Sequence, residues 1–124
     1  LLGIYRQSTD EQLFPYVRPQ ESGNKTDVRW LELTNDDGVG IRVEGLQPLS
    51  VSAMPYRSED LDPGLGTKKQ MHYSDIEPRR EVVLHVDLAQ RGLGGDNSWG
   101  MSPHDQYRLT GDRYEYGYVI RPLN

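Results

Sequence analysis

The sequence predicts an all-β protein, built as an antiparallel β-sandwich or one large curved sheet with at most one short helical turn. Its 13 glycines and 8 prolines among 124 residues favour many turns over long helices. Apolar and polar residues alternate in about six short segments, which is the period of strands with one buried face. Turn residues separate these segments, so short antiparallel strands are the expected units of the fold.

The first clear pattern, "DVRWLELTNDDGVGIRVEG" over residues 27–45, predicts a β-hairpin. A three-residue loop at 36–38 lets Gly38 take the left-handed conformation that this turn requires. The resulting register separates an apolar face from a charged face, with Leu33 opposite Ile41, Leu31 opposite Val43 and Glu32 opposite Arg42. A two-residue loop would mix the two faces. Val28 and Trp30 then lie on the mostly polar side, which indicates that this side is covered too.

Two later segments also alternate like strands. In "LSVSAMPY" the inward positions are Leu49, Val51 and Ala53. The segment "EVVLHVDLA" is the strongest strand candidate, because its apolar residues Val82, Leu84, Val86 and Leu88 share one face.

Between these two segments, "RSEDLDPGLG" predicts a single helical turn. Ser58 is the expected N-cap, and Pro63 with Gly64 is expected to end the turn.

The tail "QYRLTGDRYEYGYVIR" predicts a second hairpin, with a type II′ turn at Gly111-Asp112. This register brings apolar residues opposite apolar ones and unlike charges together. The predicted pairs are Leu109 with Tyr114, Tyr107 with Tyr116, and Arg108 with Glu115.

Composition excludes several classes of function. The net charge of −5 and the pI of about 5.1, without a basic cluster, argue against nucleic acid as a partner. The chain has no cysteine, so disulfides and thiolate metal sites are excluded. No apolar run approaches the roughly 20 residues that cross a bilayer. The first residues, "LLGIYRQS", look like a cut made inside a longer protein.

Catalytic groups are not expected within the chain. No two carboxylates are arranged by the pattern at the roughly 5–9 Å separation that a glycosidase uses. The three histidines, His72, His85 and His104, form no closely spaced pair of metal ligands, and His85 is expected on the outer face of its strand. No serine lies in a nucleophile elbow.

The segment "QRGLGGDNSWGMSPHDQY", residues 90–107, places Trp99 among glycines and small polar residues. A phosphate-binding loop is disfavoured, because Asn97 stands where G-x-G-x-x-G needs glycine and no helix pattern follows. Two interpretations remain open: the indole plugs the end of its own sandwich, or the loop displays it to a ligand. A sugar would suit the displayed indole, whose flat apolar face matches the C–H face of a pyranose.

The residues around Trp99 are then expected to shape the loop. Gly94 and Gly95 allow backbone angles that a Cβ would forbid. Asp96, Asn97 and Ser98 are expected to form the turn, and His104 to fix the loop through a hydrogen bond.

Two stretches of this sequence carry a family resemblance. The run "YVRPQESGNKTDVRWLELT" (16–34) and the run "HVDLAQRGLGGDNSWGMSPHDQYRL" (85–109) closely resemble the C-terminal small-chain domain of large bacterial β-galactosidases, in family two of the glycoside hydrolases. The match extends over almost the whole chain, so residues 1–124 are predicted to be a single domain, the C-terminal portion of the small-chain domain. Ser22 departs from the asparagine common in that family, and the earlier half of the domain is absent.

The resemblance implies an all-β supersandwich attached to a (β/α)₈ barrel of the same parent chain. In the family, the barrel supplies the two catalytic glutamates, and Mg²⁺ and Na⁺ are expected in other domains. Trp99 matches the tryptophan that stacks on the galactoside in the aglycone-side subsite. The parent is expected to be a retaining enzyme and a homo-oligomer, soluble in the bacterial cytoplasm or periplasm, and the isolated fragment is expected to be inactive.

Two other classes of function compete with this interpretation. A stand-alone carbohydrate-binding module would bind sugar without other domains. A purely structural interface domain would bury Trp99 within its own sandwich. The solvent accessibility of Trp99 therefore separates the hypotheses.

Overall fold

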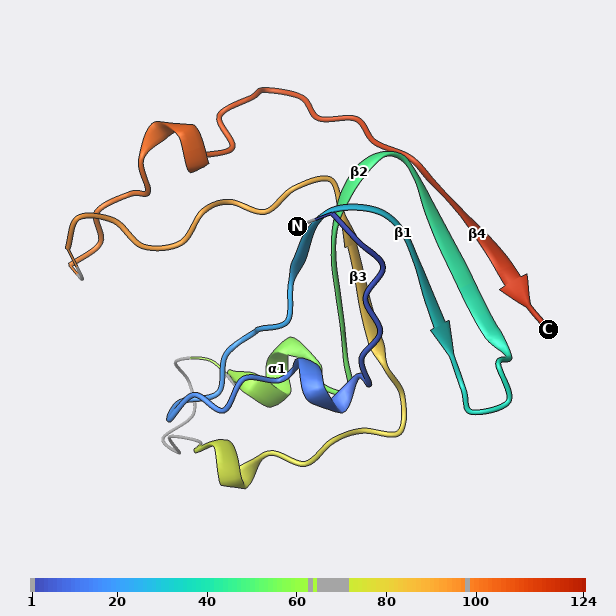
Figure 1. The fold of residues 1–124 in the computed structure, drawn as a ribbon. Helices are drawn as coiled ribbons and strands as arrows, with labels where there is room; N and C mark the ends of the chain where they lie inside the picture. Colours follow the sequence, from blue (N-terminus) through green and yellow to red (C-terminus); the bar gives the residue numbers. More distant parts are fainter. Residues whose placement is uncertain (1, 63, 65–71, 98) are drawn as a thin grey trace. The chain divides into compact units, whose positions relative to one another are not determined.

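A computed structural model describes residues 2–62, 64, 72–97 and 99–124 (Figure 1). The chain divides into two compact units, and each is described by itself. Unit 1 contains Leu1–Lys25 and Val51–Val86, and unit 2 contains Thr26–Ser50 and Asp87–Asn124. The single domain over 1–124 stays a prediction.

The all-β fold class is confirmed. The described residues form one four-stranded sheet in which β1, β3 and β4 each pair with β2. In the same described residues, helical structure is limited to the single turn α1 and to three-residue 3-10 turns. The strands are β1 (Lys25–Thr34), β2 (Gly40–Met54), β3 (Val83–Asp87) and β4 (Tyr118–Leu123); α1 is Ser58–Leu61, and the 3-10 turns are η1 (Asp10–Gln12), η2 (Tyr73–Asp75) and η3 (Asp105–Tyr107).

The β1–β2 hairpin of unit 2 has the predicted three-residue loop. The Asn35 backbone N–H donates to the Val39 carbonyl at 2.9 Å, and Gly38 takes the left-handed conformation with φ +80°. On the charged face, Arg42 pairs with Glu32 at 2.9 Å. The Arg42 guanidinium also lies 4.2 Å from the ring centre of Trp30, a cation–π contact that covers the indole. The predicted register is therefore confirmed.

The second predicted strand is not a separate element. Residues 49–53 continue the hairpin strand, so β2 runs unbroken over 15 residues. Leu49 is 1% exposed and Val51 is 6% exposed, as the alternation predicts, whereas Ala53 is half-buried.

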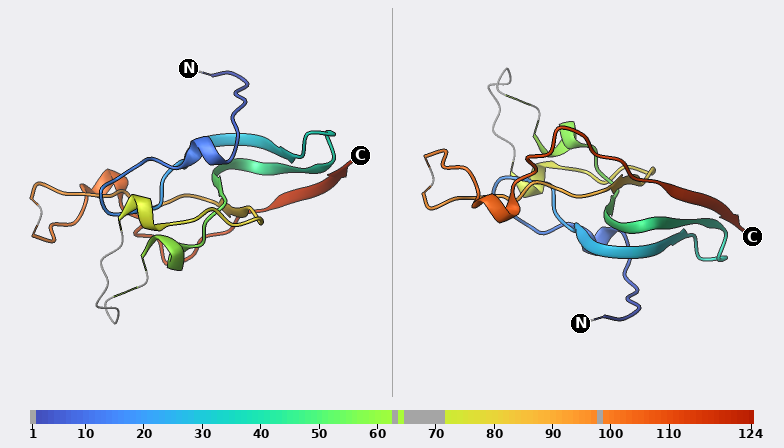
Figure 2. Two further views of the ribbon diagram at one scale, coloured as in Figure 1. Left: turned by 90° about the horizontal axis from the view of Figure 1, so that it is seen from below. Right: turned by 90° about the horizontal axis from the view of Figure 1, so that it is seen from above.

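The predicted tail hairpin is wrong. Residues 108–117 contain no strand, and Gly111 lacks the positive φ that a type II′ turn requires. Instead β4 lies beside β2, antiparallel, from Gly40 opposite Leu123 to Gly45 opposite Tyr118 (Figure 2). This pairing sets Ile120 opposite Val43, which is fully buried. It also gives hydrogen-bond partners to backbone groups along one edge of β2, which a local hairpin in the tail would leave unpaired.

Ser58 is not the cap of α1. The capping residue is Arg57, whose backbone N–H donates to the Asp60 carboxylate at 2.8 Å. The Ser58 hydroxyl donates instead to the Glu21 carboxylate at 2.6 Å. Gly64 follows the turn with φ +88°, and Pro63 lies outside the described residues.

Strand β3 is shorter than the pattern predicted and does not have one exposed face. All its residues are half-buried, including His85, which was expected on the surface. Val82 and Leu88 lie just outside the strand. Because both faces of β3 are partly covered, the alternation in its sequence does not separate an inner from an outer face.

Unit 1 has a small apolar core of Leu13, Met54 and Leu61. The loop before β1 is tied down by Ser22, whose hydroxyl accepts from the Phe14 N–H at 2.9 Å and donates to the Gln12 carbonyl at 3.2 Å. The residue that departs from the family pattern thus has a full set of local hydrogen bonds.

A bidentate ion pair links α1 to the segment before β3. Arg79 contacts both carboxylate oxygens of Asp60, at 2.5 and 2.7 Å. This hydrogen bonding lowers the pKa of Asp60 from 3.8 to about 2.

We expect Gly38→Ala to loosen the β1–β2 hairpin. Nothing lies within 4 Å of an added Cβ, so the penalty comes from the positive φ alone and amounts to about 1 kcal/mol. Hydrogen–deuterium exchange of peptides covering residues 27–45 should become severalfold faster. Asp37→Ala is the matched control in the same loop, and equal exchange in the two variants would contradict the strained turn.

We expect Asp60→Asn to destabilise unit 1 near neutral pH by roughly 1–2 kcal/mol. The folded pKa of about 2 lies below the ordinary value of 3.8. The pair therefore stabilises fully above about pH 4, and this contribution is lost as the pH falls toward 2. Urea unfolding of both proteins from pH 6 to pH 2.5 should show the difference shrinking.

The control for this prediction is Asp62→Asn. Asp62 pairs with Arg18 at 3.4 Å, and both side chains are about 60% exposed, so that pair contributes little. An Asp60→Asn effect that stays constant with pH would show that the ion pair is not its source.

Candidate functional site

The candidate site is the loop of residues 92–107, here called the Trp99 loop, which lies in unit 2 between β3 and β4 (Figure 1). Its two ends are joined by a hydrogen bond from the Gly92 N–H to the Tyr107 carbonyl at 2.7 Å. A Cβ on Gly92 would lie 2.6 Å from the Tyr107 Cβ, so only glycine permits this approach. Pro103 is buried. The base of the loop is therefore closed.

The two arms of the loop also meet above the base. Gly94 has φ +82°, and a Cβ on Gly95 would lie only 2.5 Å from the Met101 carbonyl. The glycines thus serve two different needs, a left-handed backbone at one position and a close approach at the next. Beyond them, the His104 Nε2 donates to the Asp96 Oδ1 at 2.8 Å, with both side chains largely exposed.

The tip of the loop holds Trp99. The Asn97 side-chain oxygen accepts a hydrogen bond from the Trp99 backbone N–H at 2.9 Å, an Asx turn that fixes the peptide before the indole. Gly100 follows with φ +104°. Ser98, which was expected to help form the turn, lies outside the described residues.

Trp99 is 93% exposed. A ring this exposed does not plug the end of its own unit, because a plug would be shielded by the residues around it. The Trp99 loop instead presents the indole to whatever lies beside it, while its own backbone is held by hydrogen bonds and glycine contacts.

A hollow of about 180 Å³ lies between the arms of the loop. Its walls combine an aromatic ring, a carboxylate, an imidazole and apolar side chains, from Leu93, Gly94, Gly95, Asp96, Pro103, His104 and Tyr107.

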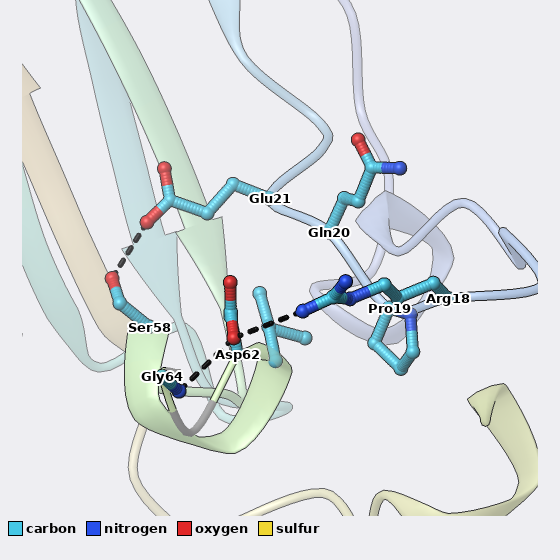
Figure 3. A pocket seen from close by; sticks show the side chains of 8 residues that line it. Arg18, Pro19, Gln20, Glu21, Ser58, Asp62 and Gly64 are labelled. Atoms are coloured by element: carbon cyan, nitrogen blue, oxygen red, sulfur yellow. Dashed lines mark hydrogen bonds and ion pairs between the residues drawn. The ribbon is translucent and has the colours of Figure 1, made fainter. Parts of the chain in front are cut away.

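A larger hollow of about 560 Å³ lies in unit 1 beside α1 (Figure 3). Arg18 forms an ion pair with Asp62 at 3.4 Å, and the Glu21 carboxylate accepts a hydrogen bond from the Ser58 hydroxyl. Sequence reasoning assigned no role to this hollow. The run "RPQE" at residues 18–21 could have indicated this hollow, but it entered only the family resemblance.

Within the described ranges, no three histidine or acidic side chains gather in a way that could hold a metal ion. In the same residues, no helix is both long and apolar enough to cross a bilayer. The chemistry that the described site offers is binding through an exposed aromatic face with polar groups nearby.

Comparison of the sequence with known proteins identifies one family. Residues 1–120 match the family model of the β-galactosidase small chain. The chain belongs to the β-galactosidase small-chain family. Both motifs identified in the sequence, at 16–34 and at 85–109, fall within the matched region.

Individual β-galactosidases are also similar to this small chain. It is 37% identical over 123 residues to a β-galactosidase of Priestia megaterium, covering 98% of the chain. It is 38% identical over 115 residues to one of Bifidobacterium adolescentis, covering 90% of the chain, and 30% identical over 125 residues to one of Streptococcus thermophilus, covering 99%. The 124-residue chain spans only 10–12% of the length of these three relatives.

The Trp99 loop of this small chain should tolerate alanine poorly at Gly95. The added Cβ would clash with the Met101 carbonyl, so the two arms must separate, at about 1–3 kcal/mol. At Gly94 the space is open and only the positive φ is strained, at about 1 kcal/mol.

Hydrogen–deuterium exchange of peptides covering residues 92–107 measures this difference. Gly95→Ala should accelerate exchange more than Gly94→Ala, with Ser102→Ala as the neutral control on the same loop. The reverse order would contradict the close packing of the arms.

Proposed function

We propose that this chain is the C-terminal, β-structured part of a retaining β-galactosidase, and that its Trp99 forms the aglycone-side wall of the sugar site. Two findings support the proposal: family membership, and relatives that bear the name β-galactosidase. The observation that carries it is the 93% exposure of an indole on a loop whose backbone is held in place.

An indole is well suited to this position. Its flat apolar face stacks on the C–H face of a pyranose, and its N–H remains available as a hydrogen-bond donor. Covering on the order of 100 Å² of this face contributes at most about 2.5 kcal/mol. This amount gives selectivity and weak affinity, which fits a role of Trp99 in substrate binding.

The family resemblance implies how binding and catalysis are divided between domains. The glycosidic bond is cleaved by two carboxylates of the parent enzyme, which we place in a catalytic barrel elsewhere in the same polypeptide. That barrel and the galactoside are the partners of the Trp99 loop.

The test is Trp99→Ala in the full-length enzyme with lactose as substrate. We expect KM to rise by about three- to tenfold while kcat changes little, because a lost stacking contact weakens ground-state and transition-state binding alike. The KM of Trp99→Phe should lie between those of the wild type and Trp99→Ala, since a smaller ring retains part of the stacking surface.

Leu93→Ala is the matched control. It removes another almost fully exposed apolar side chain from the same loop, and KM should change less than twofold. An unchanged KM in Trp99→Ala would contradict the proposal, as would lactose binding by the 124-residue chain alone at the affinity of the whole enzyme. The second result would favour a stand-alone carbohydrate-binding module.

A further inference from the structure

We propose that His104 and Asp96 are positioning residues for Trp99, acting as a latch across the Trp99 loop. The inference rests on the proposed function, because it concerns how the indole is held for the sugar. Its structural basis is the hydrogen bond from the His104 Nε2 to the Asp96 Oδ1 at 2.8 Å.

The latch joins the two arms near the tip of the loop. The backbone bond between Gly92 and Tyr107 closes the base, and the approach of Gly95 to the Met101 carbonyl brings the arms together above it. The latch adds a side-chain hydrogen bond that holds the arms at this approach. It shortens the loop closed by hydrogen bonds from residues 93–106 to residues 97–103, and halving the length of a flexible loop favours its closed form by at most about threefold.

The latch is connected to the indole through Asn97. Asp96 directly precedes Asn97, and the Asn97 side chain accepts the backbone N–H of Trp99 at 2.9 Å. Fixing Asp96 therefore fixes the residue that orients the Trp99 peptide. On the other arm, Pro103 is buried and immediately precedes His104, so the imidazole extends from an anchored position.

The environment of the pair supports positioning and argues against a role in overall stability. The side chains of His104 and Asp96 are 64% and 72% exposed, and polar side-chain pairs this exposed stabilise a fold very little. The acid next to His104, Asp105, pairs with Arg108 at 3.0 Å. Removing the latch should therefore change where the indole lies while leaving the protein folded.

The kinetic test uses the full-length enzyme with lactose. We expect His104→Ala to raise KM about threefold with kcat within twofold, because the indole is less often in place. In a Trp99→Ala background the same substitution should change KM no further, since it acts only through the indole. Asp96→Ala should behave in the same way.

Two further variants serve as a rescue and as a neutral control. His104→Gln keeps a nitrogen donor near the position of Nε2 and should restore most of the wild-type KM. Asp105→Ala removes the acid next to His104, which pairs with Arg108 and takes no part in the latch, so KM should stay at the wild-type value.

A spectroscopic readout tests the latch without activity. In enzyme labelled with 5-fluorotryptophan, the fluorine-19 resonance missing from Trp99→Phe is that of Trp99. His104→Ala should shift or broaden this resonance in the absence of substrate, and His104→Gln should restore it.

The outcomes separate the two proposals. A Trp99 resonance unchanged by His104→Ala would overturn the latch, as would a KM effect of equal size with and without Trp99. If Trp99→Ala raises KM but His104→Ala does not, the latch fails and the sugar-stacking function stands. If Trp99→Ala leaves KM unchanged, the stacking function fails whatever the resonance shows.

Discussion

The backbone pairing of β2 is the constraint on which the described structure depends. Each of β1, β3 and β4 is hydrogen-bonded to this one strand, and its side chains include Val43 and Leu49, which are 0% and 1% exposed. A strand with neighbours on both edges satisfies the peptide groups that a shorter hairpin would leave to water. Because β3 and β4 both pair with β2, the loop that connects them starts and ends on ordered strands.

The Trp99 loop combines a constrained backbone with an unshielded side chain. Glycines permit the close approach of its arms, and Asn97 orients the tip, yet the indole itself is left in solvent. Leaving a large apolar ring in water makes the isolated chain less stable than a fold that buries the ring. A binding site that spans two domains needs a side chain of this kind, because each half of the site is incomplete without the other.

Local sequence patterns predicted correctly those elements whose partners are close in the sequence. The β1–β2 hairpin followed from turn chemistry and facing pairs, because the partner strand is a few residues away. The prediction for the tail failed for the opposite reason. Residues 118–123 pair with the edge of β2, which lies far away in the sequence, and no local pattern records that this edge is available. The helical turn was placed correctly, but its cap was not, because Glu21, far away in sequence, engages the Ser58 hydroxyl.

The sequence singled out the residues of the candidate site but not the partner of each. An isolated tryptophan among glycines and the family motif pointed to Trp99, Asp96 and His104, whereas the bond between the last two depends on how an irregular loop closes. The hollow beside α1 was missed altogether, since Arg18 and Asp62 meet only in the folded chain.

An indole that contributes so little to its own fold is also free to change. Most aromatic residues are constrained by the packing around them, so their replacement destabilises the protein before it can alter function. Position 99 carries almost no such constraint, because its side chain is exposed. Under the proposed stacking role, natural variation or directed evolution can therefore change the side chain that meets the sugar while the scaffold keeps its stability.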